Sequence, residues 1–543
     1  MSQPIAPDAP APASKAAPKV VSAWAPFGQR AFALLWTATL ISNIGTWMHD
    51  VGAGWLMTTL TPSPAIVALV QAATTAPVFL FALFAGALAD RLDKKVLLLV
   101  VNAVMAIAAA LMALSAQAGI MTPALLVAFT FALGAGAAFI APAWQAIVPS
   151  LVPREALSPA IALNSMGINI ARAIGPAIAG FLIAAIGLAA PFYANVISLL
   201  VIIAALLVWK PAPAPERTLP PESIFGAMLT GLRHARHNPA LKATLLRALG
   251  FFFCASAYWA MLPLIAKGVP GGDAQLYGIL LTSTGAAAVG GALFLPRLKE
   301  HLSANGLVNL GTLGTVGALA LFALVPAVWA AVLGSLLAGA SWIAVLTSLN
   351  VSAQTSLPNW VRARGLAVLL MVFFGSMTAG ATGWGQVAEF ASVSSALLAA
   401  GAGLLLALPF IRKAELGQGE KLDLTPAAHW PAMPALGEGE DDRGPVLITL
   451  EYAIAPADEH AFLTALHALK DERFRDGAFD WGVGQNSDDP TRWTEWFMVS
   501  SWLEHERQHQ RVTKHDRELQ DAVRAFHRSD APVRVTHLIA PKR

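Results

Sequence analysis

The sequence predicts an all-α membrane protein built from two six-helix halves, followed by a soluble α+β domain. Of its 543 residues, 56% are hydrophobic and only 13% are charged, whereas soluble domains carry about 25% charged residues. The charges are divided unevenly. Residues 30–413 hold 19 basic and 9 acidic side chains, and the much shorter segment 444–543 holds 13 and 16. Apolar stretches of about 20 residues, the length that crosses a bilayer, recur throughout the first region.

The same composition excludes several classes of protein. A formal net charge of only +3 gives no sign of a nucleic-acid partner. The single cysteine, Cys254, excludes a disulfide framework and a cysteine-based metal site. The sequence contains no phosphate-binding loop, dinucleotide fingerprint or nucleophile elbow, so we expect no cofactor and no ATP-driven step.

Twelve apolar spans follow a short tail. Residues 1–29 begin with an Ala- and Pro-rich stretch without an apolar core or a cleavage pattern, which predicts a disordered cytoplasmic tail rather than a signal peptide. Loops after even-numbered spans contain thirteen Lys and Arg residues, and loops after odd-numbered spans contain only Lys267. The positive-inside rule therefore places both termini in the cytoplasm. The predicted spans are approximately 30–58, 64–89, 96–115, 123–148, 158–186, 190–209, 241–266, 274–296, 305–325, 327–350, 364–388 and 393–411.

The longest loop divides the spans into two halves of six. The halves cover residues 30–209 and 241–413. The cytoplasmic loop between them, 210–240, starts with a Pro-rich stretch, and we expect it to continue as a surface helix over 222–237.

An internal repeat supports this division. Gly86-Ala-Leu recurs as Gly291-Ala-Leu, and Gly175 recurs as Gly380, each at an offset of 205 residues. A shared offset predicts two parallel six-helix repeats, which is the layout of one large class of transporters.

The C-terminal region has a different pattern. A linker rich in Gly, Pro and acidic residues, 414–443, leads to the domain 444–543. There the hydrophobic periodicity gives the order βαββαβ, which suggests a cytoplasmic ferredoxin-like domain. The predicted strands are 446–452, 478–485, 492–500 and 533–539, and the predicted helices are 457–473 and 504–527.

The loop after the second span reads Gly86-Ala-Leu-Ala-Asp90-Arg91-Leu-Asp93-Lys94-Lys95. It resembles the signature loop of the major facilitator superfamily, although Asp93 stands where that pattern usually has glycine. The resemblance implies a twelve-span major facilitator fold and a gating role, as a charge relay that locks neighbouring helices. In the second half Leu295 replaces the Asp, so the lock is expected to be asymmetric. The alternative is an ordinary positively charged loop. The implied gating residues are Gly86, Asp90, Arg91, Lys94 and Lys95.

The fifth span reads Gly167-Ile-Asn-Ile-Ala171-Arg172-Ala-Ile-Gly175-Pro176-Ala-Ile-Ala179-Gly180. It resembles the antiporter motif of facilitator-superfamily exporters, with Ala171 and Ala179 in place of glycines. The resemblance implies export, because the motif hinders leak when the cavity faces inward. The alternative is close helix packing, which small residues on one helical face also favour. The implied motif residues are Gly167, Ala171, Gly175, Pro176 and Gly180.

Asp50 lies in the first predicted span and Arg172 in the fifth. A central Asp or Arg costs about 2.5–3.5 kcal/mol on insertion scales, so Asp50 and Arg172 are expected to face protein or a wet cavity. We hypothesise that Asp50 takes up and releases a coupling proton, with His49 or Arg172 tuning it. The alternatives are a static ion pair or polar network, and a hydrogen-bonded packing role for His49.

Other polar side chains in the spans are candidates to line a substrate cavity. Asn43, Trp47 and Asp50 share one helical face, and Asn169 shares another with Arg172. The alternative for each polar candidate is a hydrogen bond between helices. The candidates are Asn43, Trp47, Trp144, Gln145, Asn164, Asn169, Asn350 and Gln354.

Two further segments, Pro142-Ala-Trp144-Gln145 and Trp360-Val-Arg362-Ala-Arg364-Gly365, add to the likeness, as does the tail segment that begins Trp502-Leu-Glu-His505. Together they resemble the transmembrane secretion effector branch of the superfamily, which includes enterobactin-exporter-like proteins. The resemblance implies a proton-coupled antiporter of the inner (plasma) membrane that exports small amphipathic compounds such as drugs or siderophores. Its partners are then a small-molecule substrate, protons and the lipid bilayer. Import or uniport stays open, and so does a membrane-anchored sensor or enzyme acting through residues 444–543.

The tail contains a literal HExxH segment, His505-Glu506-Arg507-Gln508-His509, and His515 has the third-ligand spacing of metzincin proteases. Val512 occupies the position that needs glycine, and no Met follows residue 515. We therefore expect no metal site and a solvated, His-rich helix face. The domain also resembles dimeric α/β barrels, which implies a homodimer through residues 444–543; a monooxygenase-like activity is the weaker option.

Overall fold

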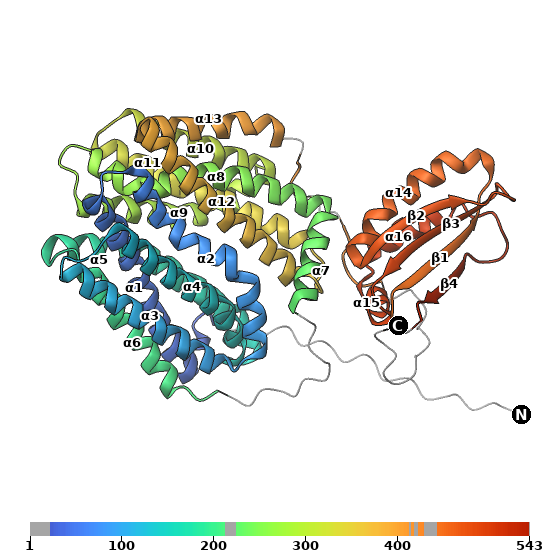
Figure 1. Cartoon of the computed structure of the whole chain (residues 1–543), viewed down its shortest axis with the longest axis horizontal. Coiled ribbons are helices and arrows are strands. Elements are labelled where there is room, and N and C mark those ends of the chain that lie inside the picture. Colours follow the sequence, from blue (N-terminus) through green and yellow to red (C-terminus); the bar gives the residue numbers. More distant parts are fainter. Residues whose placement is uncertain (1–21, 212–223, 412–413, 418–421, 428–442, 542–543) are drawn as a thin grey trace, which may run out of the picture.

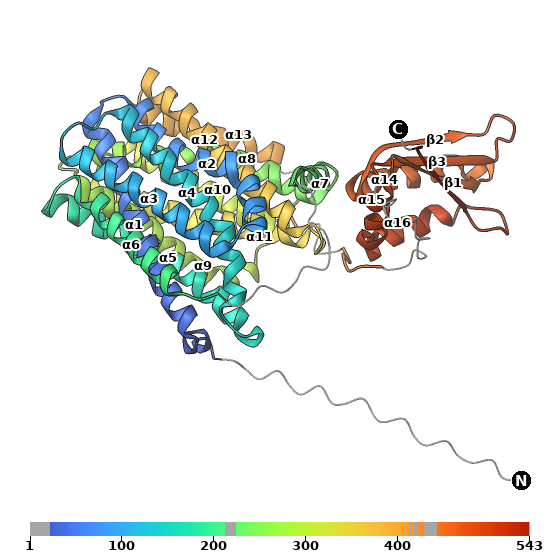
Figure 2. The same cartoon turned by 60° about the horizontal axis from the view of Figure 1, so that its bottom comes forward.

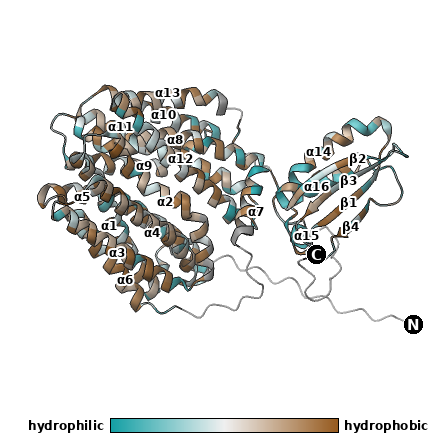
Figure 3. Cartoon of the chain, viewed as in Figure 1, coloured by the Kyte–Doolittle hydropathy of each residue, from teal (hydrophilic) through white to brown (hydrophobic). Residues whose placement is uncertain are grey.

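The computed structural model describes residues 22–211, 224–411, 414–417, 422–427 and 443–541 (Figure 1). It has two bodies, a bundle of long helices and a smaller domain in which helices pack against a sheet. Apolar residues dominate the bundle, and polar residues are concentrated on the smaller domain (Figure 3). Most of the predicted N-terminal tail, part of the inter-half loop and most of the predicted linker lie outside the described residues.

The first half of the bundle consists of six helices, three of which begin at a capping side chain. Ser63, Asp93 and Thr122 each accept a hydrogen bond from the backbone N–H three residues later, which satisfies a donor that the helix leaves unpaired. Asp93, which departs from the superfamily pattern, therefore starts the third helix. The helices are α1 (Arg30–Leu60), α2 (Pro64–Arg91), α3 (Lys94–Gln117), α4 (Pro123–Ile147), α5 (Leu157–Ala185) and α6 (Ala190–Val208).

The second half repeats this arrangement. Among the described residues, eleven helices of the chain are long and apolar enough to cross a membrane, and α13 is a shorter apolar helix over Val393–Pro409. The twelve predicted spans thus correspond in order to these twelve helices. The inter-half helix is α7 (Ile224–Arg236), and the second half contains α8 (Pro239–Gly268), α9 (Ala274–Lys299), α10 (Ala304–Leu324), α11 (Val328–Thr355), α12 (Arg362–Phe390) and α13 (Val393–Ile411).

The two halves meet through equivalent helices. α5 of the first half packs against α9 of the second, and α12 of the second packs against α2 of the first. A β-carbon at Gly180 would lie 3.0 Å from the carbonyl oxygen of Ala274, and one at Gly385 would lie 2.6 Å from the β-carbon of Ala68. Both crossings are close because these positions are glycine. The fifth and second spans of one half thus meet the second and fifth of the other, as a repeat requires.

The C-terminal domain is a four-stranded sheet packed against helices. The strand order is β2-β3-β1-β4, and all neighbours are antiparallel, as in a ferredoxin-like unit. Alternate residues of β1 and β3 are buried and pack with Phe462 and Leu466 of α14. The elements are β1 (Val446–Ala453), α14 (Glu459–Asp476), β2 (Ala478–Gln485), β3 (Arg492–Val499), α15 (Trp502–Arg511), α16 (Lys514–Arg524) and β4 (Arg534–Ile539).

The single helix predicted over 504–527 is wrong, because α15 and α16 are separate. Val512 has an extended backbone between them. Thr513 then starts α16 with a capping box, in which its hydroxyl and the Asp516 carboxylate accept hydrogen bonds from each other's backbone N–H groups. The local cap therefore stops one helix and starts the next.

Helix α7 lies between the C-terminal domain and the bundle (Figure 2). It packs against α12 on one side and α14 on the other. Arg233 of α7 donates to the carbonyl oxygen of Gly477 at 3.2 Å and lies 3.5 Å from the Glu504 carboxylate. The guanidinium of Arg511 lies over the ring of Trp360 at 4.6 Å. The described part of the predicted surface helix is thus an interface helix.

His234 is enclosed at the same interface. Its side chain is buried, and its ring meets that of Trp360 edge-on with the centroids 5.6 Å apart. Burial, together with the charges of Arg475 and Arg511, holds the pKa of His234 well below its ordinary value. A neutral imidazole therefore lies between the domain and the bundle.

Candidate functional site

Two adjoining cavities lie inside the bundle. The larger, of about 400 Å³, is lined by all six helices of the first half and by Phe374 of α12. The smaller, of about 250 Å³, is lined by α1, α2 and α5 and by α8, α9, α11 and α12. Asp50, Thr74 and Phe374 line both cavities. The cavities therefore meet at the contact between the halves, where secondary transporters bind their substrates.

Asp50 of α1 is the one acidic residue among the described side chains that line these two cavities. Its carboxylate has no hydrogen-bond or ion-pair partner among the residues that the structure describes. The static ion pair considered as an alternative is therefore not formed. The carboxylate is left facing the cavities.

Arg172 of α5 lines the smaller cavity together with Asp50. Its guanidinium carbon lies 5.6 Å from the ring centroid of Trp47, which is a cation–π geometry. Its Nε is buried without a hydrogen-bond partner in the described part of the chain. A cation and a carboxylate thus line one cavity without direct contact.

His49 faces the larger cavity. Neither of its ring nitrogens has a hydrogen-bond partner among the described residues, and the ring packs edge-on against Phe192 at 5.3 Å. The hydrogen bonds of the alternative packing role are not formed among the described residues, where the ring packs against Phe192.

Five of the eight predicted cavity residues line the two cavities. Asn43, Trp144, Gln145 and Asn164 line the larger one, and Trp47 lines the smaller. The indole N–H of Trp144 donates to the amide oxygen of Asn164 at 2.9 Å, so α4 and α5 orient each other's side chains at the cavity wall.

Asn169, Asn350 and Gln354 line neither cavity. The amides of Asn169 and Asn350 donate to carbonyl oxygens one turn earlier in their own helices, at 2.9 and 3.1 Å. Gln354 is exposed. The amides of Asn169 and Asn350 are thus used in local contacts, and none of the three side chains forms part of the walls of these cavities.

Several lining residues were missed by sequence reasoning. Asn102 and Asn195 carry the same signal as Asn43, an amide inside an apolar span, and this signal was available. The aromatic residues of the second half carry no such signal, because large rings also face lipid or fill ordinary cores. These missed aromatic residues are Trp259, Tyr277, Trp342, Phe373 and Phe374.

The predicted gating loop connects α2 to α3. A β-carbon at Gly86 would meet open space, and Lys94, the first residue of α3, is half-buried. Lys95 donates to the carbonyl oxygen of Trp209 at 2.5 Å, which ties α3 to the end of α6. The side chains of Asp90 and Arg91 lie outside the described residues, so the charge relay stays a prediction.

The small residues of the predicted antiporter motif lie where α5 packs against α1 and α9. A β-carbon at Gly175 would lie 2.6 Å from the β-carbon of Trp47, and one at Gly167 would lie 3.4 Å from the Trp36 ring. Ala171 is buried. The Pro176 carbonyl and Gly180 approach Gly278 of α9 in the same way. All these contacts are helix packing.

Two side chains join the halves at the end of the bundle where α1 stops and α2 starts. The Lys267 ammonium of α8 donates to the Thr58 carbonyl oxygen at 2.6 Å. The Glu389 carboxylate of α12 accepts hydrogen bonds from the Ser63 hydroxyl at 2.6 Å and from the Ala65 backbone N–H at 3.3 Å. We call this set the far-end latch, because it joins the two halves at the end of the bundle opposite α7.

The HExxH segment lies on α15 and does not form the expected solvated face. His505 is only 1% exposed and lines a pocket between the sheet and the helices. Glu506 is exposed. The expectation is wrong for His505 because the helix turns this residue toward the sheet.

A family model described as transmembrane secretion effector matches residues 21–543, which is nearly the whole chain. The chain belongs to the transmembrane secretion effector family. It is a multi-pass membrane transporter of the major facilitator type, since its family and its structural neighbours are transporters and not enzymes.

Curated relatives of this family member are named for siderophores. The staphyloferrin A transporter of Staphylococcus aureus is 25% identical over 280 residues, which cover 50% of this chain and 68% of the relative. The enterobactin exporter EntS of Salmonella typhimurium is 27% identical over 321 residues, which cover 59% of this chain and 76% of the relative.

Solved structures of other transporters share the fold of the bundle. A bacterial homologue of the human lysosomal transporter Spinster, inward-facing and unoccupied, has a TM-score of 0.55 at 15% identity over 72% of this chain and 95% of its own. A POT family transporter in complex with 5-aminolevulinic acid has a TM-score of 0.57 at 14% identity over 71% and 97%. At these identities the likeness shows the fold alone.

Proposed function

We propose that the chain is a proton-coupled exporter, an antiporter of the inner membrane that moves small amphipathic compounds such as siderophores or drugs by alternating access. The observation that carries this proposal is the position of Asp50, whose carboxylate lines both cavities at the contact between the halves. Ionisable residues inside membrane spans commonly mark proton and substrate pathways. Arg172 and His49, which line the same cavities, are the residues proposed to tune Asp50.

The proposed orientation has both termini in the cytoplasm, as the loop charges favour. The larger cavity extends from Asp50 to Thr39 near the start of α1 and to Leu206 near the end of α6. The far-end latch closes the opposite end. With this orientation the arrangement corresponds to an inward-facing state, in which substrate enters from the cytoplasm. The loop 86–95 is then the proposed cytoplasmic gate, and the small face of α5 is the proposed barrier to leak.

The cavity walls favour a particular class of substrate. A volume of about 400 Å³ falls in the range of roughly 300–1,000 Å³ that is typical of small-molecule sites. The smaller cavity places the rings of Trp47, Trp259 and Trp342 near the Arg172 guanidinium. Rings beside a cation suit an aromatic compound with acidic groups. Because one relative is named as an enterobactin exporter, a catecholate siderophore is the first substrate to test.

The test measures enterobactin transport by the purified chain in proteoliposomes under an imposed pH gradient. We expect the gradient to accelerate transport by the wild type and to have no effect on Asp50→Asn, because the amide cannot exchange a proton. Glu300→Gln is the matched control, since Glu300 is an exposed carboxylate at the end of α9. Wild-type activity with a flat pH dependence in Asp50→Asn would refute proton coupling.

A second proposal concerns the sheet face that points away from the helices of the C-terminal domain. Strand register places Leu447, Met498, Trp496 and Leu538 on this face, and Leu538 is 55% exposed. We propose that the same faces of two chains pair, so that residues 444–543 form a homodimer. Trp496→Lys should convert the detergent-purified dimer to a monomer in a mass measurement. A monomeric wild type would contradict this proposal.

A further inference from the structure

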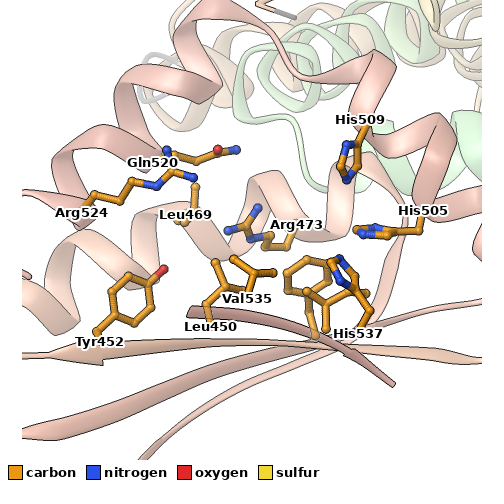
Figure 4. A pocket seen from close by; sticks show the side chains of 12 residues that line it. Leu450, Tyr452, Leu469, Arg473, His505, His509, Gln520, Arg524, Val535 and His537 are labelled. Carbon is orange, nitrogen blue, oxygen red and sulfur yellow. The ribbon is translucent and has the colours of Figure 1, made fainter. Parts of the chain in front are cut away.

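A pocket of about 130 Å³ opens at the edge of the C-terminal domain, between the sheet and the helices (Figure 4). Its floor is apolar and includes Ile448 and Leu450 of β1 and Phe497 of β3. Its rim carries three imidazoles: His505 and His509 of α15 and His537 of β4. Two histidines of the HExxH segment thus share a pocket with a third that no sequence pattern connects to them.

The three rings lie close together at one side of the pocket (Figure 4). The ring centroids of His505 and His509 are 4.8 Å apart, and those of His505 and His537 are 4.9 Å apart. His505 and His509 share a helix face because they are one turn apart. The antiparallel register pairs His537 with Ile448, a core residue, so β4 places His537 on the sheet face that meets the helices.

The geometry of His505 is that of a side chain prepared for a ligand. Its Nδ1 lies 3.1 Å from the amide oxygen of Gln508, so the Nδ1 N–H donates and Nε2 keeps its lone pair. Nε2 is buried and has no partner among the described residues. A buried acceptor without a partner is unfavourable, so a ligand that binds it is favoured. Metal-binding histidines are commonly held in this way, by a hydrogen bond at one ring nitrogen while the other binds the ion.

We propose that His505, His509 and His537 bind one divalent transition-metal ion of the class that prefers imidazole ligands, such as Zn²⁺. Three neutral imidazoles are a known ligand set for such ions and leave one position for water or another ligand. Among the described residues that line this pocket there is no Asp or Glu, which disfavours Mg²⁺ and Ca²⁺. Its charged side chains are Arg473, which pairs with Glu495 at 3.0 Å, and Arg524, which lies 3.7 Å from Asp521. His509 and His537 lie at the accessible rim, and their side chains rotate toward His505 when the ion binds.

The described residues contain one tighter set of donors, formed by carboxylates. Glu472, Asp476 and Asp516 bring three oxygens within 4.8 Å of one another, which is closer than the three imidazoles. Arg475 pairs with Asp476 at 3.5 Å and also with Asp516, and Arg473 lies 3.5 Å from Glu472. Guanidinium groups already compensate this cluster, so it forms a buried ion network.

The proposed site differs from the zinc-protease pattern in two respects. His515, the third ligand of that pattern, lies on α16 and pairs with Glu518 at 3.5 Å, and it does not line the pocket. Glu506, which would be the general base, is exposed and also outside the pocket. The third ligand is therefore His537, and the site holds an ion without the protease base.

The same helix connects this site to the transporter. α15 carries His505 and His509 toward the pocket, while its Glu504 and Arg511 contact Arg233 of α7 and Trp360 of the bundle. A bound ion that holds α15 in place at the pocket therefore affects the contacts of α15 with Arg233 and Trp360. This regulatory consequence rests on the proposed transport function, whereas metal binding does not.

The test uses the full-length chain in detergent, purified without a histidine tag and titrated with Zn²⁺ against a competing chromophoric chelator. We expect one ion per chain. Replacing a ligand should weaken binding more than the roughly 10–100-fold typical of lost supporting hydrogen bonds, so His537→Gln and His505→Gln should each lose more than about 100-fold. His515→Gln is the matched control and should bind like the wild type. Absence of stoichiometric binding, unchanged affinity in His537→Gln, or loss in His515→Gln would each overturn the proposal.

Three further measurements separate binding from folding and from transport. His537 is exposed on the edge strand, so His537→Gln should keep the wild-type melting temperature without metal. Co²⁺ in place of Zn²⁺ should give the visible spectrum of a tetrahedral ion in the wild type and not in this variant. Zn²⁺ should change the transport rate of the wild type and leave His537→Gln unaffected. Stoichiometric binding with an unchanged transport rate would overturn the coupling through α15.

Discussion

With the proposed orientation, in which the far end faces outside, breaking the far-end latch should shift the transporter toward an outward-facing state. Lys267→Ala removes the donor that lies 2.6 Å from the Thr58 carbonyl oxygen, and Glu389→Ala removes the acceptor of the Ser63 hydroxyl and the Ala65 N–H. Hydrogen bonds to charged groups contribute about 1.5–3 kcal/mol. Both charged side chains are exposed, so screening by water reduces each contribution to about 1 kcal/mol.

The two changes together therefore remove about 2 kcal/mol from the closed far end. At about 1.4 kcal/mol per factor of ten, this corresponds to a roughly 30-fold shift in the conformational equilibrium. If the outward-facing population of the wild type is about 1%, that population should rise to roughly a quarter of the molecules in the double variant. Each single variant should produce a shift of about fivefold.

The shift can be measured by the distance between two spin labels at the far end. The only cysteine, Cys254, is buried. It can be replaced by serine, so that only the introduced cysteines carry spin labels. Ile120 and Trp329 are 66% and 63% exposed. Ile120 lies in the loop between α3 and α4 of the first half, and Trp329 lies in the first turn of α11 of the second half, so cysteines there report on far-end opening. Lys299→Ala, which removes an exposed cation at the other end of the bundle, is the control. A double variant whose distance distribution matches the wild type would refute the reasoning.

Three further predictions concern packing and docking. Gly180→Val should lower the melting temperature, because its β-carbon would lie 3.0–3.4 Å from α9 backbone atoms and overpacking costs about 1–3 kcal/mol. Gly290→Val is the control and should leave the melting temperature unchanged, since a β-carbon there meets open space. Arg511→Ala should raise hydrogen exchange in α7. The change removes the cation over Trp360 and leaves Glu504 with a longer contact to Arg233. Equal exchange in wild type and variant would contradict this prediction. Acidification below about pH 6.5 should weaken the docking of the C-terminal domain on the bundle. The pKa of His234 is lowered in the docked state, so the separated state binds more protons. His234→Gln should flatten this pH dependence, which crosslinking across the interface measures.

Much of the bundle could be predicted because lipid imposes a simple pattern on the sequence. Span length and loop charge predict the helices, and Asn43 and Gln145 stand out because an amide inside an apolar span needs a polar environment. Asn350 gives the same signal, yet its amide bonds to its own helix. Sequence does not show which side of a helix faces the cavity, because both sides of a buried span are apolar. For the same reason Trp259 and Trp342 could not be distinguished from ordinary core residues.

The C-terminal domain was harder to predict where tertiary contacts determine which residues lie together. The break between α15 and α16 was readable, since Thr513 and Asp516 have the spacing of a capping box. The pocket was not readable, because His537 joins His505 only through the pairing of β4 with β1. Strand order brings together residues that no local motif connects.

The attachment of the C-terminal domain has a mechanical consequence. Its described contacts with the rest of the chain include α7, His237 just after α7, and Trp360, and α7 packs against α12 of the second half. In the proposed alternating access, the second half therefore carries the C-terminal domain with it. In the proposed dimer through residues 444–543, it is the two second halves that the paired domains connect.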